Sequence, residues 1–134
     1  MESLKATLDA LSAANEDKAA ATAKATDTRA AAVDAGWAAL EAIDVQRKAE
    51  ADFAAVHRVL NNMPDIDERK KEYWLRYDKL GREVVALREP EAAAKAKAAA
   101  AKAAAEEASA QLLKAQQVEK DAFDRYTKHL WGEE

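Results

Sequence analysis

Apolar residues recur at alternating steps of three and four along much of the sequence, which is the spacing of one stripe on an α-helix. The stripe is longest in the second half of the chain, where it continues for about six heptads. Its members there are Tyr73, Tyr77, Leu80, Val84, Leu87, Ala94, Ala98, Ala101, Ala105, Ala108, Leu112 and Ala115. Shorter stripes are formed by Leu4, Leu8 and Leu11, and by Phe53, Val56, Leu60 and Met63. This pattern predicts long helices that pack in the manner of a coiled coil.

Between Gly36 and Val45 the apolar spacing drifts. Trp37, Leu40 and Ile43 follow one another at steps of three, without the step of four that a heptad requires. Inserted or missing residues in a heptad pattern locally unwind or overwind a coiled coil. We therefore predict a stutter in the register at this point and not the start of a new domain.

One segment has the composition of a full turn. Asn61 and Asn62 can adopt the left-handed conformation that ends a helix, and Pro64 cannot continue one. Asp65 and Glu68 have the spacing of a helix N-cap with a capping box. The sequence therefore predicts a single helical domain over residues 1–134, with a first arm at about 3–61, a turn at 61–65 and a second arm at about 66–131.

Alanine accounts for 36 of the 134 residues and is concentrated in residues 13–35 and 92–110. If the turn folds the chain back, residue n lies opposite residue 126 minus n, and these two stretches face each other. Small side chains let two helices approach closely. The same register places Gly36 level with Pro90, which predicts a shared bend. We therefore predict an all-α fold, namely a long antiparallel helical hairpin that is coiled-coil-like, alanine-rich and kinked near Gly36 and Pro90.

A compact four-helix bundle is the alternative architecture, with the arms broken at the same two residues. Pro90 suits the first position of a new helix, and Glu89 before it is disfavoured in the helical conformation. The core of such a bundle would be poor, because so many of its residues are alanine. The hairpin is therefore the favoured architecture.

The residue types that carry common enzyme chemistry are scarce. The three glycines, Gly36, Gly81 and Gly132, are too far apart to form a phosphate-binding loop, and the chain has no cysteine. His57 and His129 lack the glutamate three residues earlier that a di-iron bundle needs. We therefore expect a protein that is not an enzyme and that holds no cofactor and no metal.

The formal net charge of −4 supplies no general attraction for nucleic acid or for an anionic membrane. No uncharged stretch approaches the ~20 residues that cross a bilayer. Glu2, Asp9, Glu16 and Asp17 interrupt the region where a signal peptide needs an apolar run. We expect no membrane span, and either a cytoplasmic protein or a soluble domain of a larger protein.

Residues 65–88 combine aromatic side chains with seven basic and six acidic residues, a local net charge of +1. Tyr73 and Tyr77 fall on the predicted stripe, whereas Trp74 lies one position off it. A half-exposed tryptophan beside arginines is a common anchor of protein interfaces. The alternative is that Trp74 only covers the edge of the hairpin. The predicted partner-binding residues are Met63, Ile66, Arg69, Lys70, Tyr73, Trp74, Arg76 and Tyr77.

At the other end, a group of apolar residues extends past the start of the chain in the predicted register and has nothing opposite it. An unpaired apolar overhang favours self-association. Its members are Phe123, Tyr126, Leu130 and Trp131.

The leading functional hypothesis is a non-catalytic helical interaction module that presents its turn and the adjacent basic-aromatic flank to a protein partner. One alternative is a self-assembling structural coiled coil, of the kind found in phage or secretion assemblies. The other is nucleic-acid binding through residues 69–88, which the interspersed acidic residues disfavour because they weaken each phosphate contact.

Overall fold

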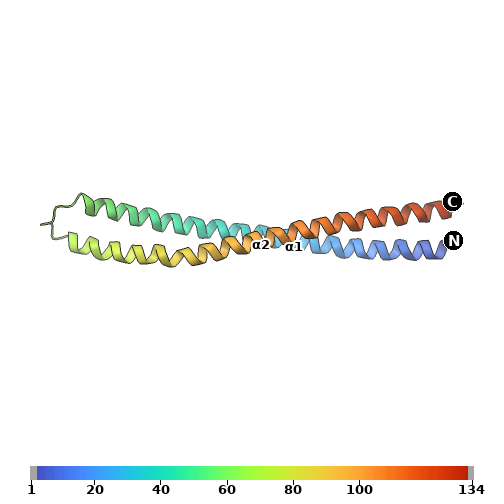
Figure 1. Cartoon of the computed structure of the whole chain (residues 1–134), viewed down its shortest axis with the longest axis horizontal. Coiled ribbons are helices and arrows are strands. Elements are labelled where there is room, and N and C mark those ends of the chain that lie inside the picture. Colours follow the sequence, from blue (N-terminus) through green and yellow to red (C-terminus); the bar gives the residue numbers. More distant parts are fainter. Residues whose placement is uncertain (1–2, 133–134) are drawn as a thin grey trace. The chain divides into compact units, whose positions relative to one another are not determined.

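The computed structural model describes residues 3–132 and has two helices in them, α1 (Leu4–Asn61) and α2 (Lys70–Leu130). The helices pack against each other as an antiparallel hairpin (Figure 1). The predicted all-α hairpin is therefore confirmed. The helices are not interrupted at Gly36 or Pro90, so the described residues form two helices and not the four of the alternative bundle.

Contacts along the hairpin divide the chain into two compact units. The turn unit comprises residues 34–99 and contains the connection between the helices. The terminal unit comprises the described residues of 1–33 and 100–134. Each unit consists of one segment of α1 and one segment of α2. That both belong to one domain stays a prediction.

Burial follows one unbroken heptad along each helix, and we call these positions the seam. On α1 the seam comprises Thr7, Leu11, Ala14, Lys18, Ala21, Ala25, Thr28, Ala32, Ala35, Ala39, Ala42, Gln46, Ala49, Phe53, Val56 and Leu60. On α2 it comprises Tyr73, Tyr77, Leu80, Val84, Leu87, Glu91, Ala94, Ala98, Ala101, Ala105, Ala108, Leu112, Ala115, Glu119, Ala122, Tyr126 and His129. The stripe predicted on α2 is confirmed. In heptad notation the seam residues occupy positions a and d.

The predicted stutter in α1 is wrong. Ala35, Ala39 and Gln46 are buried at regular heptad spacing, whereas the side chains of Trp37 and Leu40 are 66% and 52% exposed. The alanine methyl groups occupy the seam, and the larger residues beside them lie on other faces of the helix. The drift in apolar spacing therefore follows residues that do not face α2.

The stripe predicted from the first leucines is also wrong in part. Leu11 lies on the seam, and Leu4 has the spacing of a seam position but is exposed. Leu8 is exposed and lies one position off the seam, which Thr7 occupies instead. The Thr7 hydroxyl satisfies its own hydrogen bond by donating to the Leu4 carbonyl oxygen at 2.8 Å.

The register differs from the predicted one. In the turn unit Gln46 contacts Val84 and Phe53 stacks on Tyr77, and the residue numbers of each pair add up to 130. In the terminal unit the long side chains of Lys18 and Glu119 form an ion pair, and their numbers add up to 137. All three contacts therefore have sums above the predicted 126.

These contacts contradict two assumptions that were made with the predicted register. Pro90 lies level with residues near 40 and not with Gly36, so the coincidence behind the predicted shared bend is absent. The ion pair between Lys18 and Glu119 places Phe123 and Tyr126 beside residues of α1, so these two residues do not extend past its start.

Gln46 is the one buried polar side chain at the seam of the turn unit among the described residues. Its amide donates to the Val84 carbonyl oxygen at 3.3 Å and to the Glu50 carboxylate at 3.2 Å. Its own oxygen, Oε1, is buried without a hydrogen-bond partner in the described chain. A buried acceptor that has lost water without gaining a donor opposes folding.

We expect Gln46→Leu to raise the free energy of unfolding by about 1 kcal/mol, because it removes the unsatisfied oxygen and adds apolar surface to the seam. Urea unfolding followed by circular dichroism measures the change. Gln117→Leu is the matched control, since Gln117 is exposed and should change stability by less than about 0.5 kcal/mol. A loss of stability in Gln46→Leu would show that its two donated bonds outweigh the unsatisfied oxygen.

Candidate partner-binding surface

The connection between the helices is built from two successive hydrogen-bonded turns. The Asp67 amide donates to the Pro64 carbonyl oxygen at 3.0 Å, and the Lys70 amide donates to the Asp67 carbonyl oxygen at 3.1 Å. Helical bonding of α2 then starts with the Tyr73 amide, which donates to the Arg69 carbonyl oxygen at 3.1 Å. The connection therefore covers residues 62–69, and α2 begins later than the predicted residue 66.

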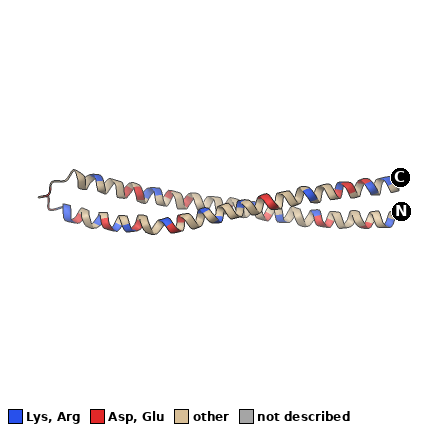
Figure 2. Ribbon diagram, in the orientation of Figure 1, with Lys and Arg blue, Asp and Glu red and all other residues tan. Residues whose placement is uncertain are grey.

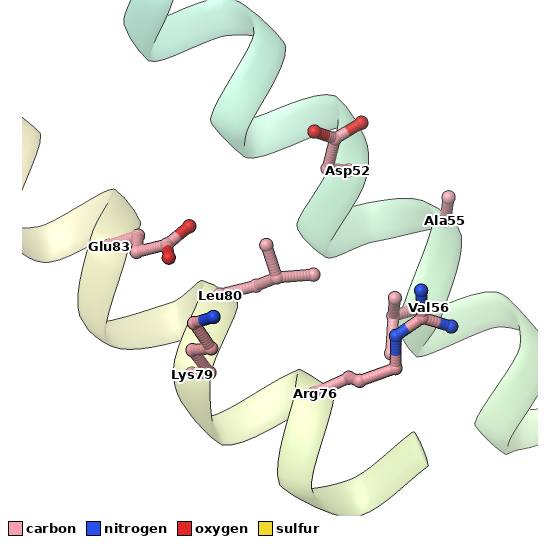
Figure 3. A pocket seen from close by; sticks show the side chains of 7 residues that line it. All are labelled: Asp52, Ala55, Val56, Arg76, Lys79, Leu80 and Glu83. Atoms are coloured by element: carbon pink, nitrogen blue, oxygen red, sulfur yellow. The ribbon is translucent and has the colours of Figure 1, made fainter. Parts of the chain in front are cut away.

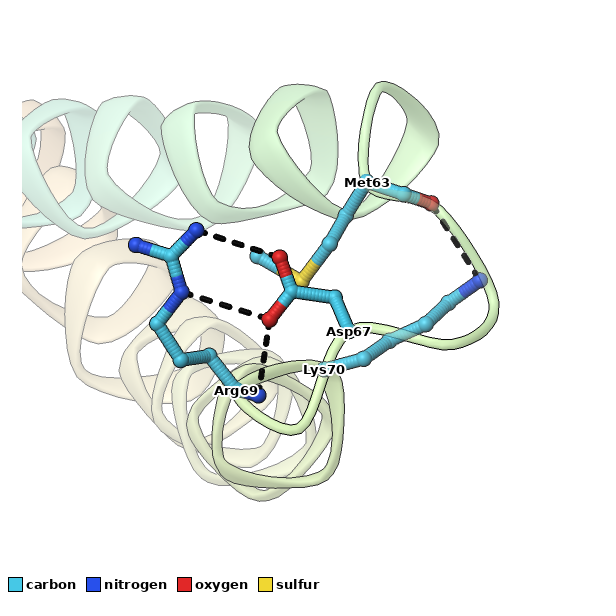
Figure 4. Close-up of polar contacts among 4 residues, drawn as sticks. All are labelled: Met63, Asp67, Arg69 and Lys70. Atoms are coloured by element: carbon cyan, nitrogen blue, oxygen red, sulfur yellow. Dashed lines mark hydrogen bonds and ion pairs between the residues drawn. The ribbon is translucent and has the colours of Figure 1, made fainter.

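Asp67, and not the predicted Asp65, accepts the backbone bond at the start of α2. Its Oδ1 accepts the Arg69 amide at 2.9 Å and Arg69 Nε at 3.3 Å, while Oδ2 accepts Arg69 Nη2 at 3.1 Å (Figure 4). A carboxylate that binds a free amide here acts as an N-cap. Asp65 instead forms an ion pair with Lys70, whose Nζ also donates to the Met63 carbonyl oxygen at 3.5 Å.

These contacts lower the pKa of both turn carboxyls. The hydrogen bond from Lys70 is the main cause at Asp65, and the hydrogen bonds from the Arg69 side chain and backbone are the main causes at Asp67. The same pairing raises the pKa of the Arg69 guanidinium. The predicted binding cations Arg69 and Lys70 are thus each neutralised by an acidic neighbour within the turn.

Four aromatic side chains meet on one flank of the turn unit, and we call them the aromatic cluster. Tyr77 is at its centre, and Phe53 stacks on it with ring centroids 4.7 Å apart and an angle of 28°. His57 lies 5.6 Å from the Tyr77 ring, and Trp74 meets that ring edge-on at 5.4 Å and 83°. Trp74 remains 48% exposed. The cluster therefore joins α1 to α2 and keeps one large aromatic face at the surface.

Gly81 makes room for the aromatic cluster. A Cβ atom at this position would lie 3.1 Å from Cε2 of Phe53, closer than ordinary contact. Beside the glycine is an open, mainly apolar groove of about 430 Å³. It is lined by Phe53, Tyr77, Asp78, Gly81, Arg82, Val85 and Ala86. The glycine in the middle of α2 is thus explained by the ring that lies against it.

The opposite flank of the turn unit carries charge. We call it the charged groove, a depression of about 550 Å³ (Figure 3). It is lined by Asp52, Ala55, Val56, Arg76, Lys79, Leu80 and Glu83. Trp74 and Gly81 follow a seam residue at heptad position e, whereas Arg76 and Glu83 precede one at position g, so the two flanks lie on opposite sides of the seam.

The remaining predicted residues differ in exposure. Ile66 at the turn is 93% exposed, and Met63 and Tyr73 are half-buried. The Arg76 guanidinium lies over the Tyr73 ring, 5.6 Å from its centroid, which is within the range of a cation–π contact. The structure therefore brings Tyr73, Trp74, Arg76 and Tyr77 together but divides them between the two flanks.

In the terminal unit Phe123 and Leu130 are each 52% exposed and Trp131 is 77% exposed, whereas Tyr126 lies half-buried on the seam. Self-association through these residues stays a prediction.

Sequence reasoning missed three contributors to this surface. His57 and Gly81 are absent from the predicted binding residues. Both lie at heptad position e, one residue after a seam position, as Trp74 does. That shared position is the signal that identifies them, once the register across the helices is known. Phe53 was placed on the seam, but its stacking on Tyr77 depends on the same register.

Acidic and basic residues alternate along both helices without a long run of one sign (Figure 2). In the part of the chain that the structure describes, no group of three or more potential metal ligands comes together. Neither described helix has an apolar stretch that could cross a membrane. No protein-family model, curated protein or solved structure matches this chain.

We expect Asp67→Ala to lower the urea midpoint at neutral pH, because the amide at the start of α2 and the Arg69 side chain lose their acceptor. The folded-state pKa of Asp67 lies below its ordinary 3.8, so its contribution is present above that pH. It is lost as the pH falls through the folded-state pKa. The difference between the variant and the wild type should therefore narrow below about pH 4.

Urea titrations followed by circular dichroism between pH 7 and pH 2.5 provide the measurement. Glu68→Ala is the control in the same turn, and it should lower the midpoint less at neutral pH, because Asp67 accepts the backbone bond. An Asp67→Ala difference that stays constant over this range would contradict the assignment of the cap to the ionised carboxylate.

Proposed function

We propose that the chain is a non-catalytic helical interaction module that binds a protein partner through its turn and the aromatic cluster. The observation that carries this proposal is the exposed face of Trp74, held edge-on against Tyr77 beside an apolar groove. Tryptophan and arginine are enriched among the residues that dominate binding energy at protein interfaces. An aromatic side chain held by its neighbours loses little conformational entropy when a partner binds.

The turn adds a second exposed apolar group next to this cluster. Ile66 is almost fully exposed and precedes the pair formed by Asp67 and Arg69. The hydrogen bonds around Asp67 order the backbone on which Ile66 is presented. An ordered turn with an apolar residue at its surface suits insertion into a pocket of a partner protein.

The electrostatics favour a protein partner over nucleic acid. Arg69 and Lys70 already have acidic partners within the turn, and Arg76 faces a groove that also contains Asp52 and Glu83. Phosphate contacts need cations that can approach the backbone without nearby acidic residues. Mixed charges of this kind are instead typical of the polar rim of a protein interface.

We expect Trp74→Ala to weaken binding of the protein partner by about tenfold or more. The partner is captured on the immobilised chain from the source organism, and its affinity for each purified variant is then measured by calorimetry. Trp131→Ala is the matched control, since it removes an exposed tryptophan of the terminal unit and should leave the affinity unchanged.

Ile66→Asp is a second variant, which alters the turn without touching the aromatic cluster and should also weaken binding. Circular dichroism must show the same helix content for all variants. Equal affinity of the wild type and both turn-unit variants would overturn the proposed site.

A further inference from the structure

His57 is the one member of the aromatic cluster whose charge a change of pH near neutrality can alter. It lies on α1 at the same flank as Trp74 and is exposed. Its ring centroid is 5.6 Å from that of Tyr77, and Trp74 meets the same ring at 5.4 Å. Histidine is the side chain that ordinarily changes its charge between pH 5 and pH 8. The cluster therefore contains a group that is a neutral ring at one pH and a cation at another.

His57 also lies between the two parts of the proposed binding site, and all of these residues belong to the turn unit. Phe53 lines the apolar groove beside Gly81, and His57 follows Phe53 by one helical turn in the direction of the connection. The connection presents the exposed side chain of Ile66. A partner that contacts both Ile66 and this groove therefore passes over His57 and the exposed face of Trp74.

His57 has no ion-pair partner among the residues that the structure describes. The charged and titratable groups on the neighbouring turns are Glu50 and Arg58 on α1, Asp65, Asp67, Glu68 and Arg69 in the connection, and Lys70, Lys71, Tyr73, Tyr77 and Asp78 on α2. Two of the acidic groups, Asp65 and Asp67, already form ion pairs with basic neighbours. The others comprise three acidic and two basic residues, so neither sign dominates. A positive charge on His57 is therefore stabilised mainly by water.

A partner that covers His57 removes this water. The neutral imidazole loses little when it is covered, because most of it is a flat ring that packs against an apolar surface. The imidazolium has two N–H donors and a full charge, and the burial of an unpaired charge costs much more than the burial of a neutral group. The partner therefore binds more tightly to the chain in which His57 is neutral.

We propose that His57 is a pH sensor of the partner-binding site, which binds its protein partner at neutral pH and binds it more weakly when His57 is protonated at acidic pH. This inference rests on the proposed function and adds a condition to it. If protonation weakens the binding of the partner, the partner must weaken the binding of the proton by the same factor. The affinity for the partner and the release of protons are therefore two measurements of the same coupling.

Calorimetry at pH 7.5 and pH 5.5 tests the sensor with the captured, purified partner. The loss of affinity from pH 7.5 to pH 5.5 should be about fivefold or more larger for the wild type than for His57→Gln, which is neutral at both pH values. Because the partner's own groups titrate equally with both chains, this comparison isolates His57. His129→Gln is the matched control, since the other histidine lies in the terminal unit, and it should keep the wild-type pH dependence. Circular dichroism must show the same helix content at both pH values.

Proton release provides the second measurement. Calorimetry at pH 6.5 in two buffers that differ in ionisation enthalpy gives the number of protons that are released when the complex forms. The wild type should release more protons than His57→Gln, because the partner selects the neutral imidazole. A wild type that instead takes up more protons than this variant would show that the partner pairs with the imidazolium, and it would overturn the proposed direction.

Two results distinguish a failure of the pH sensor from a failure of the proposed function. A partner whose binding depends on Trp74 but has the same pH dependence for the wild type and His57→Gln would overturn the pH sensor alone. A chain that captures no partner at either pH would overturn the proposed function and the pH sensor with it.

Discussion

Alanine is the most frequent residue of the seam and occupies most of its fully buried positions, and much of the structure depends on this constraint. The buried apolar residues are Ala14, Ala25, Ala35, Ala39, Leu60, Val84, Ala108 and Ala122. Each alanine buries one methyl group, worth about 0.8 kcal/mol, against about 1.5–3 kcal/mol for a buried leucine. Stability must therefore come from many small contributions along both helices. Small side chains also require the helix backbones to lie close together, so a bulky residue at one of these positions would separate them.

Several large apolar residues lie on the flanks and outer faces of the helices and not on the seam. Trp74 lies on a flank of α2 and Trp37 on the outer face of α1, and neither occupies a seam position. In most helical proteins a large apolar residue marks the core, and polar residues cover the outside. Here the heptad position, and not the hydropathy of a residue, distinguishes packing from surface.

The sequence was sufficient to predict the two helices, the turn between them and the seam of α2, because Tyr73, Leu80 and Val84 combine bulk with heptad spacing. It was insufficient between residues 35 and 46, because hydropathy cannot distinguish a buried alanine from an exposed one. The apolar spacing was therefore read through Trp37 and Leu40, which are exposed, and not through the buried alanines. The predicted register failed because the turn between Pro64 and Asp67 delays the start of α2, and a shift of a few residues changes every facing pair. Trp74 was placed correctly, since its offset depends on α2 alone, whereas its neighbours His57 and Gly81 depend on that register.

The role of each glycine within the helices depends on which residues of the other helix lie beside it. Gly36 and Gly81 occupy the same heptad position, each directly after a seam residue, and both weaken their helix relative to alanine. At Gly81 the space is occupied by a ring from the neighbouring helix, so the lost helix propensity is offset by aromatic stacking between Phe53 and Tyr77. At Gly36 no described atom lies within 4 Å of the position that a Cβ atom would take, so among the described residues no contact offsets the lost helix propensity.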